Sequence, residues 1–147
     1  MKTILVLWLS LTAGISATWQ QNEIAAVLIG EAGGEGFEGM RAVAAVIRNR
    51  AQYRKCTIHQ EISRRGSFAA YRTIHTYLHR LRTHKHKDLA LRLVEALEQR
   101  PGQLGSPVNG ADHYDGVGRN PSWSRGRQPV KVVGRHKFYR LYVRSRS

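Results

Sequence analysis

Apolar residues recur at helical spacing along most of the first hundred positions of this chain. Over residues 20–32, Ile24, Val27 and Leu28 keep the period of an amphipathic helix, and two glycines then supply a helix stop. A second stripe, rich in alanine, predicts a helix that begins around residues 37–39 and ends at about residue 49. The spacing therefore predicts two consecutive helices joined at a glycine corner.

Helical spacing continues to residue 99. We expect a short helix through Ile58 and Ile62, a turn at Gly66, and a helix over residues 69–81. Leucines at every fourth position predict a clearer helix over residues 87–99, which a Pro-Gly pair ends.

The pattern changes after residue 101. Residues 102–129 are rich in glycine and contain three of the four prolines, which predicts irregular loops with at most one short strand. Alternating apolar and aromatic residues over 130–133 and 137–143, on either side of Gly134, predict a β-hairpin. Helices followed by loops and a hairpin predict an α+β fold with a mostly helical N-terminal part, and a wholly helical domain is the alternative.

The N-terminal residues are typical of a secretory signal. Lys2 precedes an apolar run over residues 4–13, and the segment 14–17, with the small Ala17 last and a tolerated Ile15 two positions before it, suits signal-peptidase cleavage. An uncleaved anchor is the less favoured alternative, because the run is shorter than the roughly 20 residues of a bilayer span. We expect a signal peptide at 1–17, one domain at 18–147, a secreted or periplasmic location, and no stable membrane span after cleavage.

The chain is strongly basic. Its 24 Lys and Arg against 10 Asp and Glu give a formal net charge of +14, and such a surface attracts polyanions. Nucleic acid, anionic lipid and anionic cell-wall polymers fit this charge equally well, but export argues against nucleic acid as a partner. The single cysteine, Cys56, excludes an internal disulfide, so packing alone must hold the domain together.

Three glutamates lie in the stretch IGEAGGEGFEG, residues 29–39. Glu31 falls in the last turn of the first predicted helix and on its apolar stripe, where the helix dipole and burial favour a protonated carboxyl. Glu35 and Glu38 fall at the start of the next helix, where free amides stabilise a carboxylate. Glycosidases obtain an acid at neutral pH from carboxyls in such contrasting surroundings. The alternatives are helix capping for Glu35 and Glu38 and a solvated side chain for Glu31.

Other candidate residues indicate neither a metal nor a nucleophile. His75 and His79 have the spacing of a metal pair but lack a third ligand, which favours a solvated basic face. Because no third ligand accompanies these histidines, we expect no metal. No serine or cysteine elbow occurs, which argues against a nucleophilic triad, and no phosphate-binding glycine loop occurs, so we expect no cofactor. Phe68 and Tyr114 could stack on sugar rings, although packing is the commoner role of such residues. Arginines interleaved with aromatics would equally serve a single-stranded nucleic acid.

Five segments occur in the order of one family's motifs. They are AAVLIGEAGGEGFEGMRAVAAVIRNR (25–50), KCTIHQEI (55–62), RGSF (65–68), GSPVNGADHY (105–114) and PSWSRGRQPVKVVGRHKFYR (121–140). Together they resemble the SleB-type cell wall hydrolases, the spore-cortex-lytic family, over about residues 22–140. Ser67 stands where that family usually has Gln.

The resemblance implies a lysozyme-like α+β fold and cleavage of peptidoglycan between N-acetylmuramic acid and N-acetylglucosamine. The first glutamate of the family's GEA-GE turn falls on Glu31, which would be the general acid/base. Lytic transglycosylases, which this family resembles, use the substrate's own C6 hydroxyl, whereas a hydrolase would normally need a second carboxylate. Asp112 and Asp115 are the loop acids available for that task, and we favour the transglycosylase.

Four further residues are candidates for the substrate cleft. They are Glu35, Phe68, His113 and Tyr114, and Glu35 is also expected to order the turn. We expect a monomer that binds peptidoglycan and anionic cell-wall polymers. The alternative is a secreted basic protein that binds polyanions or acts on membranes without catalysis.

Overall fold

The computed structural model describes residues 16–142. The predicted signal peptide, residues 1–17, lies almost wholly outside this range, and residues 143–147 at the C-terminal end lie outside it as well. Within residues 16–142, no helix combines the length and the apolar character needed to cross a bilayer.

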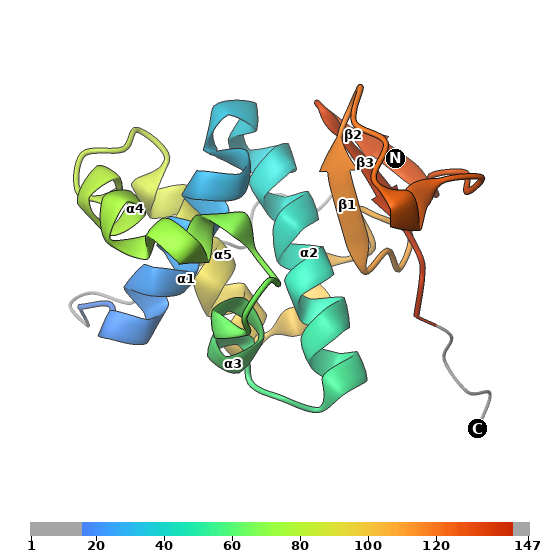
Figure 1. Ribbon diagram of the computed structural model, residues 1–147. Helices are drawn as coiled ribbons and strands as arrows, with labels where there is room; N and C mark the ends of the chain where they lie inside the picture. Colours follow the sequence, from blue (N-terminus) through green and yellow to red (C-terminus); the bar gives the residue numbers. More distant parts are fainter. Residues whose placement is uncertain (1–15, 143–147) are drawn as a thin grey trace, which may run out of the picture.

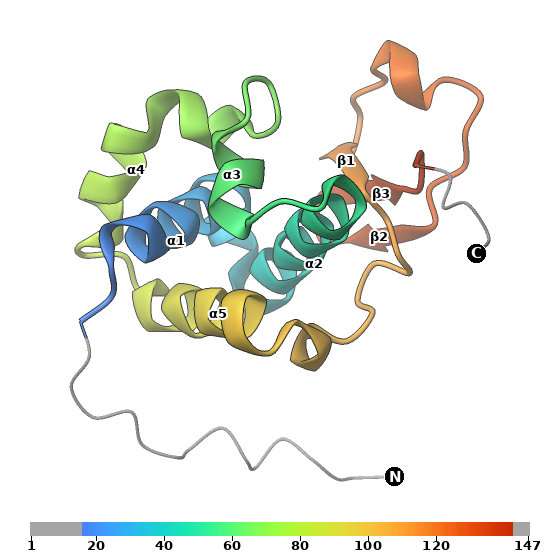
Figure 2. The same ribbon diagram turned by 90° about the horizontal axis from the view of Figure 1, so that it is seen from below.

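The first helix, α1 (Trp19–Ala32), lies at the centre of the helical part. A capping box starts it, because Thr18 and Gln21 each accept a backbone N–H of the other. Residues 24–29 are all buried, since α2, α3, α4 and α5 pack around this helix (Figure 2). An apolar surface on every side of a helix is what such a central position requires.

The second helix, α2 (Gly36–Arg54), follows α1 after a single 3₁₀ turn, Gly33–Glu35. The predicted corner is confirmed, but the helix continues five residues beyond the expected end near residue 49. The last turns of α2 are polar in sequence, so the apolar spacing used to predict the helix ended too early. Arg50 and Arg54 in this part reach a buried carboxylate on the next helix, and this tertiary contact extends the helix.

Three shorter helices complete the helical part. They are α3 (Ile58–Ser63), α4 (Ile74–Leu81) and α5 (Lys87–Gln99), with 3₁₀ segments at Ala69–Thr73 and Pro101–Leu104. The predicted bounds of α5 and the turn at Gly66 are confirmed. The single helix expected over residues 69–81 is wrong in its first part, because residues 69–73 wind as a 3₁₀ segment that lies against the end of α1.

The sheet lies on the side of α2 opposite α1 (Figure 1). Its antiparallel strands are β1 (His113–Gly116), β2 (Lys131–Val133) and β3 (His136–Tyr139), in the order β1-β3-β2. Phe138 is buried from one face of this sheet against Ala42, Ala45 and Val46 of α2. The hairpin and the mostly helical α+β fold are confirmed, and the wholly helical alternative is wrong.

Candidate active site

Glu31 lies in the last turn of α1, as expected, and its carboxylate is held by two donors from distant parts of the chain. The backbone N–H of Ala70 donates to Oε1 at 2.9 Å, and the Tyr114 hydroxyl donates to Oε2 at 2.6 Å. Glu31 as a residue is only partly buried. The end of α1, the 3₁₀ segment 69–73 and β1 therefore meet at the carboxylate of a partly buried glutamate.

Gly30 makes the contact between Ala70 and Glu31 possible. A Cβ atom on Gly30 would lie 2.6 Å from the Ala70 Cβ and 3.1 Å from the Tyr77 ring, well inside normal contact. The first glycine of IGEAGG is therefore required by a close approach of two segments, and it takes no part in the corner. The sequence carried one signal for this role, since glycine inside a helix costs about 0.5–1 kcal/mol relative to alanine.

Tyr114 joins the carboxylate to the sheet. Its ring packs on Phe138 at 5.6 Å between centroids and meets the His136 ring edge-on at 5.2 Å. Burial, together with the charge and hydrogen bond of Glu31, raises the pKa of Tyr114 well above its usual value, against the opposing charge of Arg50. The phenol therefore stays protonated at neutral pH and remains a donor to Glu31.

Glu35 ties the α1–α2 corner to the hairpin. Its Oε1 accepts the Arg135 backbone N–H at 2.7 Å, and its Oε2 lies 2.8 Å from His136 Nδ1. The side chain makes no capping bond to α2, so the capping interpretation is wrong for this residue. Gly39 leaves room for it, because a Cβ there would lie 2.5 Å from the Glu35 Cβ. These contacts support the turn-ordering role that we expected.

His136 is the member of this cluster that sequence reasoning missed. It pairs with Glu35 and packs against Tyr114, which donates to Glu31. Both glutamates of GEAGGE therefore belong to one connected group of side chains. The available signal was the position of His136 in VGRHKFY, one of the segments that carry the family resemblance.

His113 and the two loop acids lie away from Glu31. Successive residues of a strand point to opposite faces, so His113 and Asp115 face away when Tyr114 faces Glu31. His113 packs instead on Trp123. Asp115 accepts the backbone N–H of Gly116 and lies 3.4 Å from an arginine. The structure therefore does not bring His113 to the candidate acid.

Asp112 is committed to holding the chain beyond β3. It is buried, and it accepts the backbone N–H groups of Leu141 and Tyr142 at 2.8 and 2.9 Å. Burial alone would raise the pKa of Asp112, but the bonds from His113, Leu141 and Tyr142 outweigh it and hold the pKa below the usual value. Its environment is that of a structural carboxylate.

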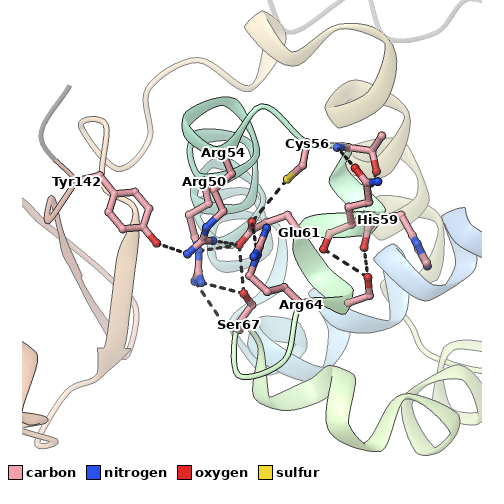
Figure 3. Close-up of polar contacts among 11 residues, drawn as sticks. Arg50, Arg54, Cys56, His59, Glu61, Arg64, Ser67 and Tyr142 are labelled. Carbon is pink, nitrogen blue, oxygen red and sulfur yellow. Dashed lines mark hydrogen bonds and ion pairs between the residues drawn. The ribbon is translucent and has the colours of Figure 1, made fainter. Parts of the chain in front are cut away.

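A fully buried glutamate, Glu61, fixes the loop that leads to the candidate site (Figure 3). Arg54 Nη1 lies 2.6 Å from Glu61 Oε1, and Arg50 Nε lies 2.9 Å from the same oxygen, as an ion pair without hydrogen-bond alignment. Ser67 completes the group, because its hydroxyl accepts from Arg50 and donates to Glu61. Two arginines and a hydroxyl thus compensate the buried charge.

This cluster explains what Ser67 does in place of the family's Gln. The short side chain of Ser67 points into the Glu61 cluster, which anchors the backbone just before Phe68. Phe68 is itself buried, with the Arg50 guanidinium 4.9 Å above its ring. Two residues later Ala70 donates to Glu31. The sequence offered little warning of this role for Glu61, because nothing local marks the acid of a short helix as buried.

The remaining polar candidates form no further site. His75 and His79 are both exposed on α4, which fits the solvated basic face. Cys56 is partly buried, with its Sγ 3.9 Å from Glu61 Oε2. Within residues 16–142 no three His, Cys, Asp or Glu side chains gather as metal ligands would.

Residues 34–139 match the family described as Cell Wall Hydrolase. The matched range includes Glu35, Phe68, His113 and Tyr114, and it begins just after Glu31. No curated protein and no solved structure matches this chain. Because the match covers well over half of its length, the chain belongs to the cell wall hydrolase family, and peptidoglycan is the substrate class that this membership supports.

Proposed function

We propose that this protein is a secreted muralytic enzyme that cleaves the peptidoglycan glycan strand between N-acetylmuramic acid and N-acetylglucosamine. Glu31 is its general acid and base. The observation that carries the proposal is the carboxylate of the partly buried Glu31, with one donor on each oxygen, in a chain of the cell wall hydrolase family.

In this proposal the reaction begins with proton transfer from Glu31 to the glycosidic oxygen. The bond from that oxygen to C1 of the muramic acid breaks, and an oxocarbenium-like sugar forms. The N–H of Ala70 and the hydroxyl of Tyr114 then stabilise the carboxylate that remains. These two donors lower the cost of giving up the proton and hold the carboxyl group in one orientation.

We further propose that the intermediate is captured by the sugar's own C6 hydroxyl. Its oxygen bonds to C1, its proton passes to Glu31, and a 1,6-anhydro product leaves while the acid is restored. The structure supports this choice because Asp115 faces away from Glu31, Asp112 is bound to backbone amides, and Glu35 is paired with Arg135 and His136. A hydrolase would need such a carboxylate to hold water.

The net charge of +14 gives the protein a second role at the wall. Long-range attraction concentrates it on anionic cell-wall polymers, where a monomer can act on neighbouring strands. The same charge suits a secreted protein that binds polyanions or membranes without catalysis, so the experiment must separate binding from bond cleavage.

The test compares three purified proteins on isolated peptidoglycan sacculi: the wild type, Glu31→Gln, and Glu38→Gln as the matched control. Glu38 lies in the same stretch but is exposed and forms an ion pair with Arg41 of its own helix. Released fragments are identified by mass spectrometry. We expect muropeptides lighter by one water from the wild type and Glu38→Gln, and none from Glu31→Gln. A wild type that binds sacculi but releases no more than Glu31→Gln would establish the non-catalytic alternative, and reducing muramic ends would establish a hydrolase.

A further inference from the structure

A pocket of about 550 Å³ opens between the end of α3 and the 3₁₀ segment 69–73. Phe68 and Tyr71 line it, and three arginines, Arg64, Arg65 and Arg72, surround it. Aromatic surface beside several cations suits a ligand that carries both an apolar part and a negative charge.

The positive charge of this pocket is largely uncompensated. All three arginines are exposed, and Arg65 and Arg72 have no ion-pair partner within residues 16–142. Arg64 lies 3.8 Å from a Glu61 oxygen, but Glu61 is already held more closely by two other arginines (Figure 3). The guanidinium groups around the pocket are therefore available to a ligand.

The pocket and the candidate acid share one segment of chain. Phe68 and Tyr71 line the pocket, while the N–H of Ala70 between them donates to Glu31. The wall of the pocket and a donor to the candidate acid therefore lie within two residues of each other along the chain.

We infer that this pocket binds a carboxylate of the peptidoglycan strand, next to the bond that is cleaved. The inference rests on the proposed function and adds its substrate specificity. A planar guanidinium binds a carboxylate through two parallel hydrogen bonds, and aromatic side chains cover the adjoining apolar groups. Two sources of this chemistry exist on a muramic acid: its lactyl carboxylate, which is free on peptide-stripped strands, and the carboxylates of an attached stem peptide.

The first experiment measures kcat/KM on three soluble strands: with stem peptides, with the peptides removed, and with all carboxylates converted to neutral methylamides. The proteins are the wild type, Arg65→Gln/Arg72→Gln, and Arg92→Gln. Arg92 is an exposed arginine on α5, and it is not among the residues that line the pocket. It therefore controls for net charge.

We expect the double variant to lose about tenfold in kcat/KM on a carboxylate-bearing strand, the effect of roughly one charge-assisted hydrogen bond. It should lose less than twofold on the neutral strand, and Arg92→Gln should lose little on any strand. A loss confined to peptide-stripped strands identifies the lactyl group as the ligand, because its carboxyl forms the amide bond to the peptide on intact strands. A loss confined to intact strands identifies the stem peptide, and a loss on both means that either carboxylate is bound. Equal losses on charged and neutral strands, or equal losses for Arg92→Gln, would overturn the inference.

A binding measurement separates this inference from the proposed function. Glu31→Gln protein, with and without the Arg65→Gln/Arg72→Gln pair, is titrated with the same three strands and Kd is measured without turnover. We expect Kd for the two charged strands to be lower when Arg65 and Arg72 are present than when both are replaced, and Kd for the neutral strand to be the same in both proteins. If the wild type cleaves no strand but the arginines still favour binding of charged strands, the proposed catalysis is wrong and the carboxylate-binding role of the pocket is kept. If cleavage occurs without this selectivity, the pocket assignment fails and the catalysis stands.

Discussion

Replacing Gly30 with alanine tests whether a close approach of two segments positions the candidate acid. The added Cβ would lie 2.6 Å from the Ala70 Cβ, whereas carbon atoms pack best at about 3.5–4.0 Å. The 3₁₀ segment must therefore move by roughly 1 Å. The same shift stretches the Ala70 N to Glu31 Oε1 bond from 2.9 Å beyond the roughly 3.2 Å limit of a good hydrogen bond.

Two terms set the size of the effect. Overpacking of this kind costs about 1–3 kcal/mol, and the better helix propensity of alanine returns roughly 0.5–1 kcal/mol. We therefore expect a net loss of about 1–2 kcal/mol in the free energy of unfolding, seen as a midpoint several degrees lower in a thermal melt. Activity should fall further, since a misplacement of about 1 Å can cost on the order of a hundredfold in rate.

Gly34→Ala is the matched control. Gly34 lies four residues along the same stretch and is exposed, and a Cβ atom added there would meet nothing within 4 Å. Its replacement should change stability by less than about 0.5 kcal/mol and leave release of fragments from sacculi unchanged. Equal stability and activity for Gly30→Ala and Gly34→Ala would refute the reasoning.

A second substitution tests whether Ala70 is the residue that the added methyl group meets. Ala70→Gly in the Gly30→Ala background removes the Cβ that the new methyl group meets, although the Tyr77 ring, 3.1 Å away, still crowds it. We expect partial recovery of activity in the double variant, whereas independent effects would add. No recovery at all would show that Gly30 acts through something other than its contact with Ala70.

Three other changes test the remaining contacts. Tyr114→Phe keeps the ring packing but removes the donor to Glu31, so kcat should fall about tenfold or more while the melting temperature changes little; an unchanged kcat would exclude a role for the hydroxyl. Glu35→Gln weakens the tie to Arg135 and His136, and hydrogen exchange of the β3 amides should quicken relative to those of α5; equal exchange would mean that the corner does not hold the hairpin. Asp112→Asn should destabilise the fold by about 1–3 kcal/mol at pH 7. Because the folded pKa of Asp112 lies below its ordinary value of 3.8, its contribution is complete above that value and is lost as the pH falls below it. Urea unfolding at pH 7 and pH 3 should therefore show a smaller difference between variant and wild type at pH 3, and a constant difference would contradict the assignment.

The helices were predictable where their ends depend on local chemistry. Paired glycines after Ala32 and the Pro-Gly pair after Gln99 stop α1 and α5 at the expected residues. The end of α2 was missed because Arg50 and Arg54 are held by Glu61 from another helix. The 3₁₀ winding of residues 69–73 was missed for a similar reason, since it depends on contact with α1.

The candidate site divides in the same way. Sequence reasoning placed Glu31 at a helix end and proposed Tyr114 as a candidate for the cleft, and the structure brings the two side chains within hydrogen-bond distance. It also grouped His113 with Tyr114, although the alternation of side chains along β1 sends them to opposite faces. Burial of Phe68 agrees with packing, the commoner role of such a residue, although Phe68 is also among the residues that line the arginine pocket.

By itself, the sequence determined which of three neighbouring glutamates ends a helix and which two begin the next, because helix termini depend on residues a few positions away. Tertiary structure alone decided what the carboxylates of Glu31 and Glu35 bind. The donors to Glu31 are 39 and 83 residues distant, and those to Glu35 are 100 and 101 residues distant. Hydrogen bonds form within about 3 Å in space whatever the separation along the chain, so no local pattern encodes them.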